Sequence, residues 1–209
     1  MTPATPLLPP HAGLSPRGIG SSWRIEQILA AAVRVFGAGG HGAVTHRAVA
    51  AEAGVSVGLT TYYFKNRENL LFSAVKYAIS IESARLHALV DDLPAQLPAD
   101  RSVAVLTEMF FDKTVADPLY DLALFEMFLE ATRNPAAREL TRAWTELILG
   151  LVERVLPPTD PSLPRAQAVQ IVAATIDGLM LEEAANQTLG LAALRTHLQA
   201  VVDRLLPHP

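Results

Sequence analysis

One segment, residues 45–71, constrains the fold more than any other part of the chain. Its sequence, THRAVAAEAGVSVGLTTYYFKNRENLL, predicts two short helices at about 45–53 and 56–64, with a tight turn at Ala53-Gly54-Val55. Thr45 and Ser56 are residue types that cap helix N-termini. Gly54 can adopt the positive φ that such a turn requires. This spacing is typical of a helix-turn-helix.

The remainder of the chain also predicts helices. Apolar residues recur at helical spacing between Ile25 and Phe36, which predicts a first helix over 22–38 that ends at the glycines of the GAGGHG run. Prolines and glycines separate further expected helices at about 66–91, 101–115, 118–132, 135–156, 163–188 and 190–206. No segment alternates with period two long enough to predict a strand. The expected fold class is therefore all-α, with about nine helices.

The expected domain organisation has three parts. Residues 1–21 contain five prolines and three glycines without periodicity and are expected to be a disordered arm. Residues 22–68 would form the helix-turn-helix domain, and residues 69–209 a larger helical domain. The chain has no cysteine, and we expect neither a signal peptide nor a membrane anchor, which favours a cytoplasmic protein.

Charge is distributed unevenly along the chain. The formal net charge is −4, yet residues 1–77 carry +4 and residues 78–209 carry −8. A basic first part and an acidic remainder fit a protein whose first module meets phosphate groups. Chance clustering of charges is the alternative explanation.

The exposed face of the second short helix is predicted to read double-stranded DNA. In a helix-turn-helix this helix lies in the major groove, where hydroxyls reach base edges or phosphates and apolar groups touch thymine methyls. Basic side chains beside the two helices would hold the phosphate backbone or reach a base. The predicted DNA-binding residues are Thr45, Arg47, Ser56, Val57, Gly58, Thr60, Thr61, Tyr62, Tyr63, Lys65 and Arg67.

Residues 24–71 resemble the DNA-binding domain of the TetR family. Each matching piece is weak alone, and the combination is specific: the apolar run 28–33 ending in Phe36 and glycines, Val44-Thr45, Ala53-Gly54-Val55-Ser56, Gly58, Tyr62-Tyr63-Phe64 and the run 65–71. The segment departs from the family at Leu59, where Ser or Thr is frequent, and at Thr60, where a core Leu is common.

The resemblance implies a homodimeric repressor, less often an activator, that binds a palindromic operator and responds to a small effector. Aromatic and Met side chains within 80–180 would line an apolar effector pocket, although the same spacing also fits plain core. The candidate pocket residues are Phe110, Phe111, Phe125, Phe128, Trp144 and Met180, with His87, Glu126 or Glu130 as polar anchors.

The resemblance also implies that helices 135–156 and 163–188 form a four-helix bundle with those of the partner. The apolar stripe of helix 135–156 fits either the core or a dimer seam, and Ile176-Asp177-Gly178-Leu179 is similar to an Asp-Gly-Leu element of the family. The predicted interface residues are Leu140, Leu147, Leu151, Val172, Ile176 and Gly178.

Other function classes receive less support from the sequence. No Glu-x-x-His pair or His-Glu-x-x-His motif is present, and no Ser/His/Asp arrangement can be argued, so we expect no catalytic site, metal or cofactor. A helical protein–protein module and a non-specific DNA binder stay open.

Overall fold

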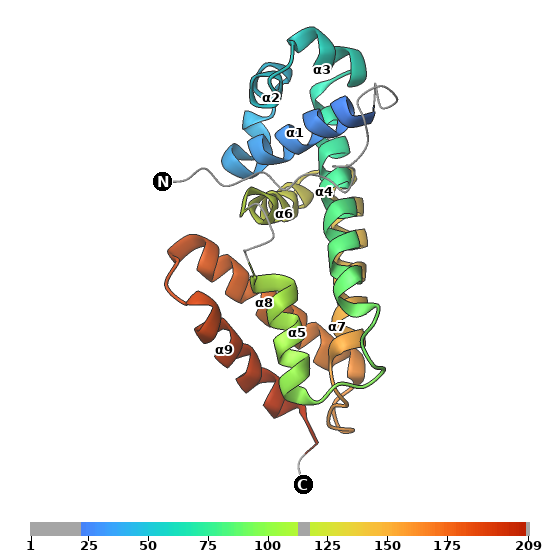
Figure 1. The fold of residues 1–209 in the computed structure, drawn as a ribbon, viewed down its shortest axis with the longest axis vertical. Coiled ribbons are helices and arrows are strands. Elements are labelled where there is room, and N and C mark those ends of the chain that lie inside the picture. Colours follow the sequence, from blue (N-terminus) through green and yellow to red (C-terminus); the bar gives the residue numbers. More distant parts are fainter. Residues whose placement is uncertain (1–21, 113–117, 208–209) are drawn as a thin grey trace. The chain divides into compact units, whose positions relative to one another are not determined.

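The computed structural model describes residues 22–112 and 118–207, and within these ranges it contains nine helices and no strand (Figure 1). The predicted all-α fold class is therefore confirmed. The predicted arm at 1–21 lies outside the described residues, and so does part of the expected helix end near 115. The helices are α1 Ser22–Ala43, α2 His46–Ala53, α3 Val57–Tyr63, α4 Arg67–Val90, α5 Ala99–Phe111, α6 Pro118–Ala131, α7 Pro135–Val155, α8 Arg165–Asn186 and α9 Gly190–Leu205.

Regular helical geometry in α1 breaks at Gly40, inside the GAGGHG run where the sequence predicted that the helix ends. Gly40 has φ 65° and ψ −168°, and a short helical segment continues beyond this kink to Ala43. A Cβ on Gly37 would overlap the backbone carbonyl oxygen of Leu119 and would lie 3.2 Å from the amide nitrogen of Ala123, both on α6. The glycine at position 37 therefore permits close backbone contact between α1 and α6, three residues before the break at Gly40.

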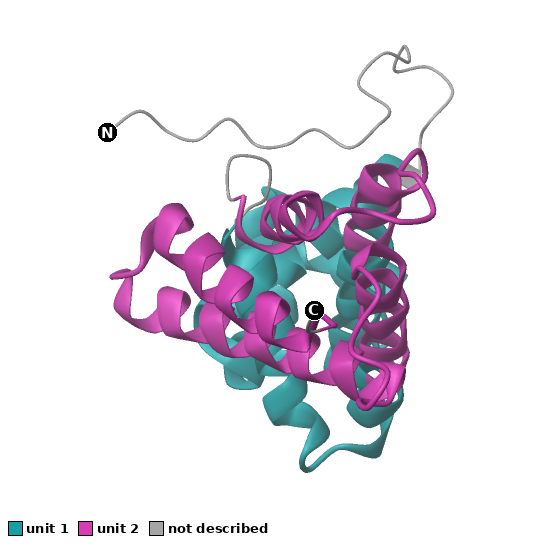
Figure 2. Ribbon diagram, turned by 90° about the horizontal axis from the view of Figure 1, so that it is seen from below, with its two compact units in different colours: residues 1–81, 113–141 teal, residues 82–112, 142–209 magenta. Residues whose placement is uncertain are grey.

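The chain divides into two compact units, coloured separately in Figure 2. Unit 1 comprises residues 1–81 and 113–141, and unit 2 comprises residues 82–112 and 142–209. Unit 1 thus holds α6 together with the helix-turn-helix, whereas α6 was expected in the second domain. No helix in the described part of the chain is long and apolar enough to cross a membrane.

The core of unit 1 is built from α1, α2, α4 and α6. Phe36 on α1, Val49 on α2, Leu70 on α4 and Met127 on α6 are each at most 1% exposed. Phe64, which follows α3, is also buried. Because helices as short as α2 and α3 are marginal alone, this shared core is what stabilises them, at about 1.5–3 kcal/mol per large apolar side chain.

Unit 2 has its own core, in which α9 packs on both α5 and α8. Leu106, Val172 and Leu198, one from each of these helices, are fully buried. The buried Ser102 hydroxyl on α5 donates to the carbonyl of Val155 on α7 at 2.7 Å, which satisfies a carbonyl at the end of that helix.

Candidate nucleic-acid interface

The caps of the helix-turn-helix are those that the sequence predicted. The Thr45 hydroxyl accepts from the amide of Ala48 at 3.0 Å, and the Ser56 hydroxyl accepts from the amide of Leu59 at 3.2 Å. Gly54 ends α2 in the left-handed region, with φ 64° and ψ 32°. Only glycine adopts that conformation without steric cost, so the turn between α2 and α3 is fixed locally.

Two side chains of helix α1 contact α2 of the helix-turn-helix. The Gln27 side-chain amide donates to the carbonyl of Ala53 at 2.8 Å, at the end of α2. Arg34 and Glu52 form an ion pair of 2.7 Å between Nε and Oε1. The first contact satisfies a helix-terminal carbonyl, so α1 supports the end of α2 next to the turn.

Helix α3 exposes most of the face that was predicted to read DNA. Tyr62 is 79% exposed and Val57 45% exposed, and Gly58 and Thr61 are also exposed. Tyr63 is half-buried, and its ring meets that of Tyr62 edge-to-face, with centroids 5.1 Å apart. Arg47 on α2 and Lys65 after α3 are exposed as well. These positions are free for contact with a ligand, and their contact with DNA stays a prediction.

Two of the predicted DNA-binding residues are turned into unit 1 instead. Thr60 is 0% exposed, which corrects its assignment to the DNA-reading face: it packs between α3 and α2. Arg67 at the start of α4 donates from Nε to the carbonyl of Val44 at 2.6 Å and from a terminal nitrogen to the carbonyl of His41. Its guanidinium therefore holds the connection between α1 and α2, which corrects its assignment as a phosphate clamp.

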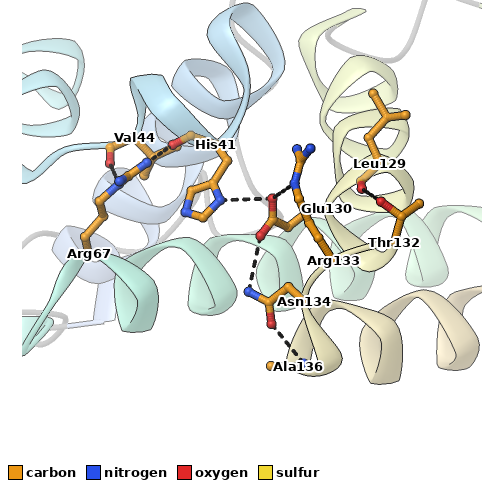
Figure 3. A network of polar contacts seen from close by, with 9 residues as sticks. All are labelled: His41, Val44, Arg67, Leu129, Glu130, Thr132, Arg133, Asn134 and Ala136. Carbon is orange, nitrogen blue, oxygen red and sulfur yellow. Dashed lines mark hydrogen bonds and ion pairs between the residues drawn. The ribbon is translucent and has the colours of Figure 1, made fainter.

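A buried carboxylate joins the ends of α1 and α6 (Figure 3). Oε2 of Glu130 lies 2.9 Å from Nδ1 of His41 and 3.1 Å from Nε of Arg133, and the Asn134 amide donates to Oε1 at 3.2 Å. Burial raises the pKa of Glu130, but the hydrogen bonds from His41, Arg133 and Asn134 outweigh it, so the pKa is lowered overall. Glu130 is thus an ionised structural residue with partners inside unit 1, rather than a vacant anchor for an effector.

The lowered pKa of Glu130 predicts a specific sensitivity to acid. A depressed carboxyl pKa contributes stability that is complete above the ordinary value of about 4.3 and disappears as pH falls through the folded-state pKa. Glu130→Gln should therefore lower the free energy of unfolding by about 1–3 kcal/mol at neutral pH. Below pH 4 the variant should lose less of its remaining free energy of unfolding than the wild type does. Urea unfolding between pH 3 and 7 measures both. Glu139→Gln, at an exposed position of the same unit, is the control, and equal pH profiles for wild type and Glu130→Gln would contradict the assignment.

The candidate effector residues are divided between the two units. Phe125 and Phe128 on α6 belong to unit 1 and are half-buried, whereas the other four belong to unit 2. Of those four, Phe111 and Trp144 are buried, while Phe110 and Met180 are half-buried. A surface hollow of about 600 Å³ in unit 2 is lined by the loop 95–96 and by the region 153–165, and by none of these six residues.

The candidate dimer residues also separate by burial. Leu151, Val172 and Ile176 are at most 5% exposed within the single chain. This corrects their assignment to an interface, because the core of unit 2 already covers them. Gly178 is exposed, and Leu140 and Leu147 are half-buried. Ile171 and Leu181 on α8 are exposed apolar side chains that were not among the predicted interface residues, because the residues predicted on that helix included its buried Val172 and Ile176.

Comparison with known proteins identifies matching family models over both parts of the chain. Residues 28–74 match the model described as "Bacterial regulatory proteins, tetR family". Residues 97–208, more than half of the chain, match the model described as "Tetracyclin repressor-like, C-terminal domain".

Individual relatives are similar over most of their length. The HTH-type transcriptional regulator BetI of Rhizobium meliloti (strain 1021) is 29% identical, over 89% of this chain and 95% of that protein. BetI of Agrobacterium fabrum is 27% identical, over 88% of each chain. Among solved structures, the multidrug binding protein EbrR complexed with imidazole is 29% identical, with a TM-score of 0.63 over 89% of this chain and 96% of that one.

Proposed function

Because the chain belongs to the TetR family of DNA-binding transcriptional regulators, we propose that it is a repressor that binds a palindromic operator as a homodimer. A small, apolar effector would release it from DNA. The observation that carries the proposal is the exposed face of α3. A helix of seven residues leaves Tyr62 79% exposed and Val57 45% exposed, and a partner that covers these side chains would explain why they are there.

Positive charge supports DNA as that partner. Arg47 on α2 and Lys65 directly after α3 are exposed, and the first 77 residues carry a net charge of +4. Side chains placed in this way can neutralise phosphates while α3 enters the major groove. A protein–protein interaction module that does not bind DNA has no need of such a charge distribution. That function is therefore the second candidate.

Gly58 on α3 gives a prediction with opposite signs for stability and DNA binding. A Cβ at this position would meet only the Ser56 hydroxyl oxygen, at 3.9 Å, so the protein's own packing does not require glycine. Gly58→Ala should therefore leave the free energy of unfolding unchanged or raise it by up to about 1 kcal/mol. It should weaken operator binding about tenfold, the effect of a lost base contact, because the added methyl group holds the helix away from the bases.

Thermal unfolding and fluorescence anisotropy with a labelled operator measure the two effects. Gly150→Ala is the matched control, since a Cβ there has nothing within 4 Å and Gly150 lies on α7 in unit 2. Unchanged DNA affinity in Gly58→Ala would contradict close approach of α3 to the bases.

The exposed face of α8 supports the proposed homodimer. Ile171 is 38% exposed and Leu181 is 54% exposed, and Ala174 and Gly178 lie between them at helical spacing. A Cβ at Gly178 would meet nothing within 4 Å. Glycine inside a helix costs about 1 kcal/mol relative to alanine, and close packing against a second copy would account for it. Two copies are also what reading a palindrome requires.

The proposed effector is a small apolar or aromatic molecule. Support comes from the apolar character of the candidate pocket residues and from EbrR, a relative described as a multidrug binding protein complexed with imidazole. The proposal as a whole is tested by selecting bound duplexes from a random pool and then titrating salt against the recovered sequence. A repressor requires both a sequence preference and a steep fall of affinity with salt.

A further inference from the structure

Thr60 is a buried polar residue in the middle of the recognition helix. It is 0% exposed, and its hydroxyl donates to the carbonyl of Val57, in the first turn of α3, at 2.8 Å. Val49 and Ala53 on α2 and Phe64 after α3 are buried apolar residues of the same motif. An apolar side chain could fill such a position without the cost of burying a hydroxyl, so the hydroxyl calls for a reason.

The second polar contact of Thr60 is with the first residue of α2. Nδ1 of His46 lies 3.3 Å from the Thr60 hydroxyl oxygen, and the His46 carbonyl lies 3.4 Å from it. A threonine hydroxyl has one proton to donate and two lone pairs to accept with. Since the shortest contact takes its proton to Val57, we assign the Nδ1 proton of His46 as the donor to Thr60. The chain of hydrogen bonds then runs from His46 through Thr60 to the carbonyl of Val57.

Both ends of this chain lie beside predicted DNA contacts. His46 precedes the exposed Arg47, and the accepting carbonyl belongs to Val57, which is exposed on the reading face. Apolar packing alone tolerates small rotations of a seven-residue helix about its own axis, because apolar contacts have no preferred direction. A directional hydrogen bond at the helix–helix contact restricts that rotation.

We propose that His46 and Thr60 are positioning residues that fix the rotation of α3 against α2 and so set which base edges the reading face meets. This inference rests on the proposed DNA-binding function. It assigns to the buried Thr60 and the half-buried His46 a role in operator affinity and sequence preference, separate from any role in stability.

The test compares Thr60→Val, which keeps the shape and removes the hydroxyl, with Thr60→Ser, which keeps the hydroxyl. The probe is the duplex that the wild-type protein selects from a random pool. Thr60→Val should bind it about tenfold more weakly and recover a less defined sequence in a repeated selection. Its thermal midpoint should stay within about 3 °C of wild type. Thr60→Ser should bind within about twofold of wild type. A residue with a merely structural role would change the midpoint and the affinity together.

A double-mutant cycle separates the link from a direct contact of His46 with DNA. If the link operates, His46→Ala weakens binding of the wild type but adds little to Thr60→Val, because the hydrogen bond is already lost. Equal effects of His46→Ala in both backgrounds would overturn the inference, as would wild-type affinity and preference in Thr60→Val. If the wild-type protein selects no sequence at all, the proposed function itself fails and this inference fails with it.

Discussion

Gly37→Ala is expected to force α6 away from α1 and to lower the free energy of unfolding by about 1–3 kcal/mol. The added Cβ would overlap the Leu119 carbonyl oxygen and lie 3.0 Å from its carbon, and both are backbone atoms that no side-chain rotation can move. The helix-propensity gain of alanine, up to about 1 kcal/mol, offsets only part of this cost. Urea or thermal unfolding of the purified protein measures the change.

Gly42→Ala is the matched control for this substitution. Gly42 lies five residues further along the chain, just after the kink at Gly40, and a Cβ there has nothing within 4 Å. Gly42→Ala should leave the free energy of unfolding unchanged or raise it slightly. If Gly37→Ala is as stable as Gly42→Ala, the close contact between α1 and α6 does not exist as described, and the placement of α6 in unit 1 loses its main support.

Arg67→Ala and Lys65→Ala should affect different properties, although both residues are basic and lie two positions apart. Arg67 donates to the carbonyls of Val44 and His41, and hydrogen bonds from a charged group contribute about 1.5–3 kcal/mol each where they are buried. Because Arg67 is half-buried, we expect a loss of about 2–3 kcal/mol in the free energy of unfolding. Lys65 is exposed, so Lys65→Ala should leave stability within about 0.5 kcal/mol of wild type.

Operator binding should separate the two variants in the opposite sense. Lys65→Ala should weaken binding to all sequences and reduce the slope of log affinity against log salt by about 1, which corresponds to one lost phosphate contact. Arg67→Ala should keep the wild-type slope under conditions where the variant is folded. A reduced slope in Arg67→Ala with unchanged stability would restore its assignment as a phosphate clamp and contradict the contacts described here.

Local chemistry in the sequence was sufficient to predict the helix-turn-helix. Thr45, Gly54 and Ser56 act on atoms within four residues of themselves, so their residue types alone indicate the two caps and the turn. Apolar periodicity was likewise sufficient for the helical class, because burial on one face repeats every three to four residues. Prolines and glycines between the helices indicated most of the helix ends.

Features that depend on distant parts of the chain could not be predicted in this way. The glycines after Phe36 indicate a helix end, and the helix does break at Gly40, but they do not indicate that Gly37 packs against the backbone of α6. Thr60 and Thr61 are adjacent and chemically identical, yet the first is buried and the second exposed. Which of them faces DNA depends on the rotation of α3 against α2. For Arg67, the sequence indicated a charge near the recognition helix but not the direction of its side chain.

The most direct test of the proposed function is selection of bound duplexes from a random pool by the purified protein, followed by sequencing. The proposal predicts a palindrome whose half-sites lie a fixed distance apart, about one or more helical turns of DNA, because a symmetric dimer presents two copies of α3. A single unpaired half-site would contradict the dimer. A pool that stays random while still binding in a salt-dependent way would contradict sequence-specific regulation and would identify a non-specific DNA binder.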